Sequence, residues 1–322
     1  MDLEKHDKTS AMTEEKIEVS VVVPVFNEEL VIEEFFHRMT QTLKKARVNY
    51  EFVFVDDGSF DGSYELLKKC KKEDPPRVRL LRLARNFGHQ LAITAGLRAA
   101  QGKAVVVVDC DLQDPPEMVL EFIRKWKEGY SVVYGIRTER KGETFFKRIT
   151  ARMFYKLIRL LTTIDIPENA GDFYLLDRVV VDILNRMEER HRFIRGLIVW
   201  VGFKRIGIGY SRAPRFAGRT KYGLWRMIKF AFDAATSFSF APLRGILFLG
   251  SVICVLAFVG ILVIIYLKLF TDRTVVGWTS LMAVVLFMGG IQLLAIGLIG
   301  EYIARIGDDV KDRPLYTIQE FL

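Results

Sequence analysis

Five short apolar runs in the first 135 residues alternate with segments that begin like helices. The runs cover residues 18–26, 50–55, 77–83, 105–108 and 131–135 and are rich in β-branched and aromatic residues. Such runs are typical of strands buried on both faces of a parallel sheet. An Ala-rich segment ending at Gly102 and a segment at 118–128 read as helices between them. Strands that alternate with helices through short connections predict an α/β fold with a doubly wound, mostly parallel sheet.

The last third of the chain contains two long runs without a charged residue, at 245–267 and 274–300. Each is long enough to cross a hydrocarbon layer of about 30 Å. We therefore predict two transmembrane helices, with buried core helices as the alternative. Arg244 and Arg305 are among the basic residues outside both runs, and such residues mark the cytoplasmic side. We expect an integral protein of the cytoplasmic (inner) membrane with both termini in the cytoplasm.

Composition adds a size and a redox setting to this pattern. The chain has 322 residues, half of them hydrophobic, and a formal charge of +8, which suits one large domain with an addition. The first 16 residues are charged and lack an apolar core, so we expect no signal peptide. The three cysteines, Cys70, Cys110 and Cys254, share no metal-type spacing and predict reduced thiols.

Two carboxylates follow the fourth predicted strand directly. Asp109 and Asp111 come at its end, and Gln113 is next to them. Open α/β sheets bind ligands at this end of their strands, and neighbouring carboxylates repel each other unless a cation lies between them. Hard oxygen ligands favour Mg²⁺ or Mn²⁺, usually shared with substrate phosphates. Two alternatives are a solvated or helix-capping loop, and a nucleotide triphosphatase strand, whose Gly-x-x-x-x-Gly-Lys-Ser/Thr loop is absent from the sequence.

Polar residues also follow the other predicted strands. They are Asn27, Glu28, Asp56, Asp57, Ser59 and Arg137. Asn27 is in addition predicted to cap the next helix. Because parallel strands share one carboxyl edge, this edge gathers acceptors for a base and ribose, a metal site and a cation for phosphate. The pattern predicts a pocket for a nucleoside diphosphate. No Gly-x-Gly-x-x-Gly follows the first strand, which disfavours a dinucleotide.

Three motifs together resemble those of the family 2 glycosyltransferases of GT-A fold. They are Val23-Pro-Val-Phe-Asn-Glu28, Val55-Asp-Asp-Gly-Ser-Phe-Asp-Gly-Ser63 and Asp109-Cys-Asp-Leu-Gln-Asp-Pro-Pro-Glu117. More narrowly, the chain resembles the polyprenyl-phosphate glycosyltransferases, which include dolichyl-phosphate mannose synthase and the bacterial undecaprenyl-phosphate glucosyltransferases. The resemblance implies metal-dependent, inverting transfer of one sugar from a nucleotide donor to a lipid phosphate. The Gln-x-x-Arg-Trp motif of processive members is absent from the sequence.

The resemblance also suggests a role for each candidate residue. Asp109, Asp111 and Gln113 would bind Mg²⁺ or Mn²⁺, with Asp111 also catalytic. The donor nucleotide would contact Pro24, Val25, Asn27, Glu28, Asp56, Asp57, Ser59, Asp109 and Arg137. A basic loop ahead of the first apolar run would bind the acceptor phosphate through Arg215, Arg219, Thr220 and Lys221. A basic linker without a ligand is the alternative interpretation of this loop.

Asp172 is the second predicted catalytic residue. It lies in Gly171-Asp172-Phe173, and in the related enzymes this Asp lies beside the acceptor and is proposed as a base. A lipid monophosphate, however, is already ionised near neutral pH. We therefore expect Asp172 to orient the acceptor or to stabilise positive charge at the sugar carbon, with a structural salt bridge as the alternative. Tyr174 stands where many relatives have Arg, which leaves a phosphate contact there open.

These features divide the chain into five parts. They are a flexible segment 1–17, a GT-A domain 18–222, amphipathic interface helices 223–242, two transmembrane helices 243–300 and a cytoplasmic tail 301–322. The tail is a candidate contact between protomers of a homo-oligomer. The expected partners are a nucleotide-sugar donor, a polyprenyl phosphate and the membrane, and not nucleic acid. UDP-glucose is the expected donor and GDP-mannose the alternative, while a membrane scaffold and an enzyme acting on soluble acceptors are the rival functions.

Overall fold

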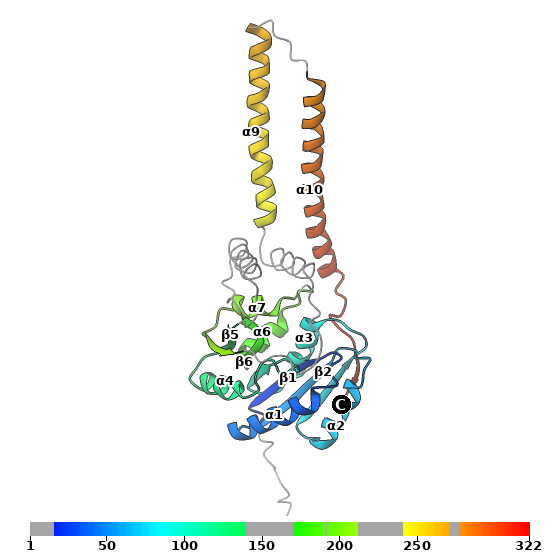
Figure 1. Ribbon diagram of the computed structural model, residues 1–322, viewed down its shortest axis with the longest axis vertical. Helices are drawn as coiled ribbons and strands as arrows, with labels where there is room; N and C mark the ends of the chain where they lie inside the picture. The colour runs from blue at the N-terminus through cyan, green and yellow to red at the C-terminus, as the bar shows by residue number, and fades with distance from the viewer. Residues whose placement is uncertain (1–15, 140–169, 191, 212–240, 271–276) are drawn as a thin grey trace, which may run out of the picture.

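The computed structural model of the protein describes residues 16–139, 170–190, 192–211, 241–270 and 277–322. Within these ranges eight strands form a single sheet, in the order β7-β5-β6-β4-β1-β2-β3-β8 (Figure 1). The strands are β1 Val19–Val25, β2 Tyr50–Asp56, β3 Val78–Leu83, β4 Ala104–Val107, β5 Val132–Glu139, β6 Ala170–Asp177, β7 Arg205–Ser211 and β8 Ile318–Phe321. The five predicted apolar runs are therefore strands.

The sheet is mixed but mostly parallel, as predicted, because six of the eight described strands run in one direction and only β6 and β8 run in the other. β1 pairs parallel with β2 and β4, β2 with β3, and β5 with β7. β6 is inserted between β4 and β5 and runs antiparallel to both, and β8 runs antiparallel to β3. The alternation of strands and helices predicted the parallel half correctly. The sequence analysis did not predict β6, because its direction is set by pairing with β4 and β5 and not by a local pattern.

Helices cover both faces of the sheet and bury its apolar side chains. One face carries α1 Ile32–Ala46, α2 Ser63–Glu73 and α4 Met118–Lys127, and the other carries α3 His89–Ala99, α6 Arg178–Arg186 and α7 Ile194–Trp200. Phe35 of α1 and Ile93 of α3 are fully buried on opposite faces. Each such side chain contributes about 1.5–3 kcal/mol by leaving water. Burial on both faces explains why the strands have few polar positions.

Two long helices, α9 Ala241–Phe270 and α10 Trp278–Val310, extend side by side away from the sheet (Figure 1). They lie where two transmembrane helices were predicted. Within the described residues, one stretch, Phe287–Val310, is long and apolar enough to cross a membrane by length and composition. The helices are thus present, while a second crossing stays a prediction. Arg305 Nε donates to Glu301 Oε1 at 3.0 Å in α10.

The C-terminal residues return to the sheet and form its edge strand, β8. The backbone N–H of Leu322 donates to Leu80 O at 2.8 Å, and the N–H of Leu80 donates to Leu322 O at 2.9 Å. The Tyr64 hydroxyl donates to Glu320 Oε2 at 2.5 Å. Part of the predicted cytoplasmic tail therefore belongs to the sheet of the chain itself. Contact between protomers stays a prediction.

Two positional predictions at the ends of the strands are corrected. Asn27 does not begin a helix, because α1 starts only at Ile32. Asn27 has a φ of 55°, and its Oδ1 accepts the backbone N–H of Phe60 at 3.0 Å. Its side chain therefore joins the loops after β1 and β2. Arg137 was expected beyond the fifth strand but lies inside β5, which extends to Glu139.

Candidate active site

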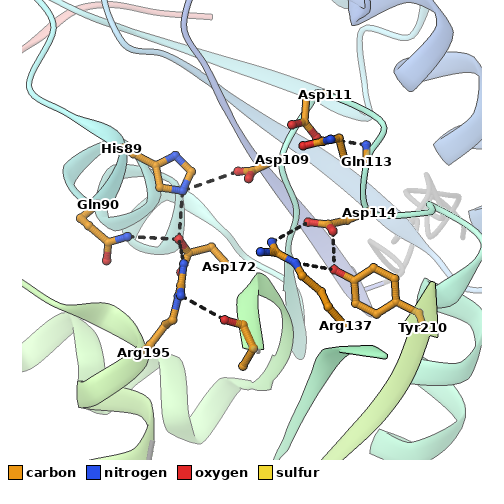
Figure 2. A network of polar contacts seen from close by, with 11 residues as sticks. His89, Gln90, Asp109, Asp111, Gln113, Asp114, Arg137, Asp172, Arg195 and Tyr210 are labelled. Carbon is orange, nitrogen blue, oxygen red and sulfur yellow. Dashed lines mark hydrogen bonds and ion pairs between the residues drawn. The ribbon is translucent and has the colours of Figure 1, made fainter. Parts of the chain in front are cut away.

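The centre of the candidate site is Asp172, which lies in β6 and is 6% exposed. The antiparallel register of β4 and β6 pairs Val107 with Tyr174, so Asp172 lies beside the residues that follow β4. Arg195 of α7 donates from Nε to Asp172 Oδ1 at 2.7 Å and from Nη2 to Oδ2 at 2.9 Å (Figure 2). Gln90 Nε2 donates to Oδ2 at 3.3 Å. Both carboxylate oxygens are therefore hydrogen-bonded.

His89 connects Asp172 to the acidic segment after β4. Its Nε2 lies 3.3 Å from Asp172 Oδ2 and 3.5 Å from Asp109 Oδ1, and 38% of its side chain is exposed. Burial lowers the pKa of His89, but the charges of Asp109 and Asp172 outweigh burial and raise it to about 9. For Asp172, burial raises the pKa, but Arg195 and His89 hold it well below its usual range. One imidazolium thus bridges two carboxylates.

The first turn of α3, which carries His89, is fixed by Asp57. This buried residue follows β2, and its two carboxylate oxygens accept the backbone N–H groups of Phe87 at 2.7 Å and Gly88 at 3.0 Å. Gly88 has a φ of 99°, a conformation that favours glycine. Gln90 Oε1 accepts the backbone N–H of Ile194, the first residue of α7, at 3.0 Å. The loop after β3 is therefore tied both to β2 and to α7.

The acidic segment holds Asp109, Asp111 and Asp114 close together. Burial raises the pKa of Asp109 to about 6, and repulsion from neighbouring carboxylates acts in the same direction, while His89 lowers it. Asp111 is 9% exposed, and its Oδ1 accepts the backbone N–H of Gln113 at 3.1 Å. In Figure 2, Asp111 lies beside Gln113, and Asp109 points toward His89. The segment therefore concentrates negative charge at the end of β4.

The residues of this segment fit a divalent cation. Carboxylates that repel each other are the hard oxygen donors that Mg²⁺ and Mn²⁺ bind, and the half-buried Asp109 and the buried Asp111 supply them. Among the residues that the structure describes, no three His, Cys, Asp or Glu side chains form a complete metal site. Mg²⁺ usually takes one or two carboxylates and completes its shell with substrate phosphates and water. Gln113 as a third ligand stays a prediction.

A second cluster joins Arg137, Asp114 and Tyr210 beside the Asp172 network (Figure 2). The buried Tyr210 hydroxyl donates to Asp114 Oδ1. Arg137 Nε donates to Tyr210 Oη at 3.3 Å, and its Nη2 lies 3.8 Å from Asp114 Oδ2. A Cβ at Gly171 would collide with the Arg137 guanidinium. The cluster therefore places a cation against the strand that carries Asp172.

The loops after β1 and β2 hold the other predicted donor residues. The backbone N–H of Asn27 donates to Ser59 Oγ at 3.0 Å, and the N–H of Ser59 donates to Asp56 Oδ1 at 3.1 Å. The N–H of Glu28 donates to Ser63 Oγ at 2.8 Å. Burial raises the pKa of Asp56, and the bonds from Ser59 oppose this effect. These hydrogen bonds hold the loops after β1 and β2 together, and we call the surface formed by Asn27, Glu28, Asp56 and Ser59 the wall of the site.

The predicted site residues that the structure describes form two neighbouring groups. Asp109, Asp111, Gln113, Asp172 and Arg137 come together. Asn27, Asp56 and Ser59 form the neighbouring wall, with Pro24 and Val25 at the end of β1, where they pair with Val55 and Asp56. Their binding roles stay predictions. Two predicted parts lie outside the described residues. They are the interface helices as far as residue 240 and the phosphate-binding residues Arg215, Arg219, Thr220 and Lys221.

The sequence interpretation missed five site residues, which are His89, Gln90, Asp114, Arg195 and Tyr210. Position offered a signal for the first three, because residues 86–90 follow β3 and Asp114 follows β4 at the same sheet edge as the predicted site. Arg195 and Tyr210 lie on α7 and β7, far along the chain. Only the pairing of β6 with β4 and β5 brings their elements to Asp172.

Comparison with known proteins gives this site its family. Residues 20–184 match the model of glycosyl transferase family 2, and residues 241–306 match the GtrB C-terminal hairpin. The chain is 52% identical over 304 residues to the uncharacterized glycosyltransferase YkcC of Bacillus subtilis, covering 94% of each chain. It is 39% identical to the SfII prophage-derived bactoprenol glucosyl transferase of Shigella flexneri, covering 94% of this chain and 98% of that protein.

A third relative is the prophage bactoprenol glucosyl transferase homolog of Escherichia coli. It is 39% identical over 303 residues, covering 94% of this chain and 99% of that protein. Each of these relatives matches 94% of the chain, and the two family models match parts of both the sheet domain and the two long helices. The chain is therefore a glycosyltransferase and belongs to glycosyl transferase family 2.

Proposed function

We propose that this enzyme transfers one glucose from UDP-glucose to a polyprenyl phosphate, with inversion at the sugar carbon, at the cytoplasmic face of the membrane. The observation that carries the proposal is the full-length similarity, at 39% identity, to proteins named bactoprenol glucosyl transferases. The geometry supports it with a charged site at one sheet edge. GDP-mannose is the alternative donor.

The donor nucleoside would lie along the wall formed by the loops after β1 and β2. Hydrogen bonds fix Asn27, Glu28 and Ser59 there, so the shape of the wall is set before the donor binds. Much of the Asp57 carboxylate is committed to the N–H groups before α3. We therefore assign Asp57 mainly to shaping the wall, and the nucleoside contacts to its neighbours.

The diphosphate would lie over the acidic segment. Asp109 and Asp111 would hold Mg²⁺ or Mn²⁺, with Gln113 as a further ligand. When bound, such an ion stabilises the negative charge on a departing nucleoside diphosphate. Arg137, held by Tyr210 and Asp114, provides a fixed positive charge next to this segment. These groups favour departure of the diphosphate.

The reaction forms one bond and breaks one bond at the sugar carbon. A phosphate oxygen of the lipid attacks from the face opposite the diphosphate, and the electron pair of the breaking C–O bond leaves with the nucleoside diphosphate. Because the attacking oxygen is already ionised near neutral pH, the step requires no proton transfer. The loop at 215–221 is proposed to draw the lipid phosphate to the membrane side of the site.

The helices α9 and α10 are proposed as two transmembrane helices that keep the enzyme where its lipid acceptor lies. The support is two long uncharged runs and the position of both helices on one side of the sheet domain (Figure 1). The flanking basic residues favour a cytoplasmic position for the sheet domain and both termini. Since β8 follows α10 and pairs with β3, the sheet domain and the C-terminus must lie on the same side.

The test is donor-dependent formation of a glycolipid by the purified full-length protein. Undecaprenyl phosphate would be mixed with Mg²⁺ or Mn²⁺ and, in parallel, with UDP-glucose or GDP-mannose. We expect product from UDP-glucose, loss of product with a chelator, and loss in Asp111→Ala. Product only from GDP-mannose would replace the donor assignment. Absence of product with every donor, from folded protein, would refute the catalytic proposal and favour a scaffold.

A further inference from the structure

We propose that Arg195, with Gln90 and His89, is a positioning residue that holds Asp172 as a fixed negative charge, so that Asp172 acts through this charge and does not accept a proton. The inference rests on the proposed transfer to a lipid phosphate. It assigns roles to three residues that the sequence motifs do not identify. It also gives a structural basis to the expectation from sequence that Asp172 is an electrostatic group and not a general base.

The contacts of Asp172 leave little room for an incoming proton. Oδ2 receives Arg195 Nη2 at 2.9 Å and Gln90 Nε2 at 3.3 Å, and His89 Nε2 lies 3.3 Å away. Oδ1 receives Arg195 Nε at 2.7 Å. Each carboxylate oxygen offers about two lone-pair sites, so the contacts with described residues crowd Oδ2, and an added proton would have to bind at Oδ1 beside the Arg195 guanidinium. Protonation would replace the charged partner of the bidentate Arg195 guanidinium with a neutral acid and would weaken that ion pair.

The partners of Asp172 are themselves fixed, which makes the charge a stationary one. Arg195 Nη1 also donates to Ala170 O at 3.0 Å, so the guanidinium is held on the strand that carries Asp172. Gln90 uses its Oε1 to accept the N–H of Ile194, one residue before Arg195. The carboxylate is therefore oriented from α3 and α7 at once. A preoriented charge that does not reorganise during the reaction stabilises developing charge effectively.

This arrangement suits the chemistry of the proposed step. Positive charge develops on the sugar carbon and ring oxygen as the bond to the diphosphate breaks, while the attacking phosphate oxygen carries no proton to remove. An ionised carboxylate beside the sugar is then useful, and a base is not. His89 Nε2 lies between Asp172 and Asp109, at 3.3 Å and 3.5 Å, which links Asp172 to the segment proposed to hold the diphosphate.

The experiment compares Arg195→Lys and Arg195→Gln with the wild type in the glycolipid assay. We expect kcat to fall by about 10- to 100-fold in both, because a displaced catalytic group costs about that much, while the donor KM changes far less. In single-turnover measurements on the wild type, we expect the rate constant of sugar transfer to be the same in H₂O and D₂O. A base would behave oppositely, because loss of Arg195 would return the carboxyl toward its usual pKa and would preserve or raise kcat.

Arg192→Lys is the matched control. Arg192 is a buried arginine of the same segment, but it donates to the backbone carbonyl oxygens of Leu184, at 2.8 Å, and Met187. We expect this change to lower the melting temperature and to leave kcat within about threefold of the wild type, a change of less than about 1 kcal/mol. An equal loss of kcat in Arg192→Lys and Arg195→Lys would overturn the positioning role.

The outcomes separate this inference from the proposed function. No product from the wild type with any donor refutes the function. The inference is refuted, and the function stands, if the wild type is active but slower in D₂O than in H₂O. The same holds if Arg195→Gln is at least as active as the wild type. Circular dichroism and melting of each variant show whether a loss of kcat occurs in folded protein, and Arg195→Lys keeps the charge if Arg195→Gln does not fold.

Discussion

Replacement of Phe173 by Leu tests how the core positions Asp172. Phe173 is fully buried in β6, directly after Asp172. Its ring centroid lies 4.6 Å from that of Phe122 and 5.9 Å from that of Tyr210. Each aromatic pair contributes about 0.5–1.5 kcal/mol beyond area burial, so loss of both pairs costs about 1–3 kcal/mol. For a domain of this size this lowers the melting temperature by roughly 2–12 °C.

We expect Phe173→Leu also to lower kcat, because β6 relaxes beside Asp172, and a displacement of about 1 Å can cost about 100-fold. Phe54→Leu is the control. Phe54 is fully buried, and its ring lies 5.5 Å from Phe52 and 6.3 Å from Phe36 in another part of the core.

The assay combines melting with glycolipid formation at a temperature well below both midpoints. Phe54→Leu should lose similar stability and keep its kcat. An unchanged melting temperature in Phe173→Leu together with a raised acceptor KM would refute the packing argument, because the ring would then contact substrate. An unchanged kcat at reduced stability would show that packing of Phe173 does not position Asp172.

Three further predictions concern the polar groups of the site. Tyr210→Phe removes a hydrogen bond to the buried Asp114 and should destabilise the protein by about 1–3 kcal/mol in denaturant titration. An unchanged midpoint would contradict this. The folded pKa of Asp172 lies below its unfolded value of about 3.9, so the stability it contributes is present above that value and is lost as pH falls through the folded pKa. The difference in melting temperature between the wild type and Arg195→Gln should therefore narrow as the pH falls below about 4, where the unfolded carboxyl binds a proton; a difference that does not narrow there would count against the pairing. Chelation should abolish turnover without lowering the melting temperature strongly, and restored turnover on adding Mn²⁺ or Mg²⁺ distinguishes metal loss from unfolding.

The parallel half of the sheet could be predicted from the sequence because its signals are local. β1, β2, β3 and β4 are apolar runs buried on both faces, and helices separate them along the chain. Parallel strands share one carboxyl edge, so the residues after these strands were correctly expected to lie together. Asp109 and Asp111 follow this rule. The helix-capping role of Asn27 was wrong because a contact with the loop after β2 uses its side chain.

The other half of the site could not be predicted because its geometry depends on distant pairings. Asp172 belongs to an antiparallel strand inserted between β4 and β5, and Arg137 lies inside β5. No residue spacing reports which strand enters a sheet between two others. The motif Gly171-Asp172-Phe173 identified an acidic residue, but its partners Arg195 and His89 come from elements that meet only in the folded sheet.

The division between local and distant signals also explains why the role of Asp172 needed the structure. From sequence, an Asp beside an acceptor can be a base, an orienting group or a fixed charge, since the choice depends on which donors surround it. The bidentate contact with Arg195 and the nearby His89 hold the carboxylate of Asp172 in one orientation. Because the proposed nucleophile is already ionised, the site has no proton to move at this position. The chemistry of the acceptor and the surroundings of Asp172 thus lead independently to the same electrostatic role.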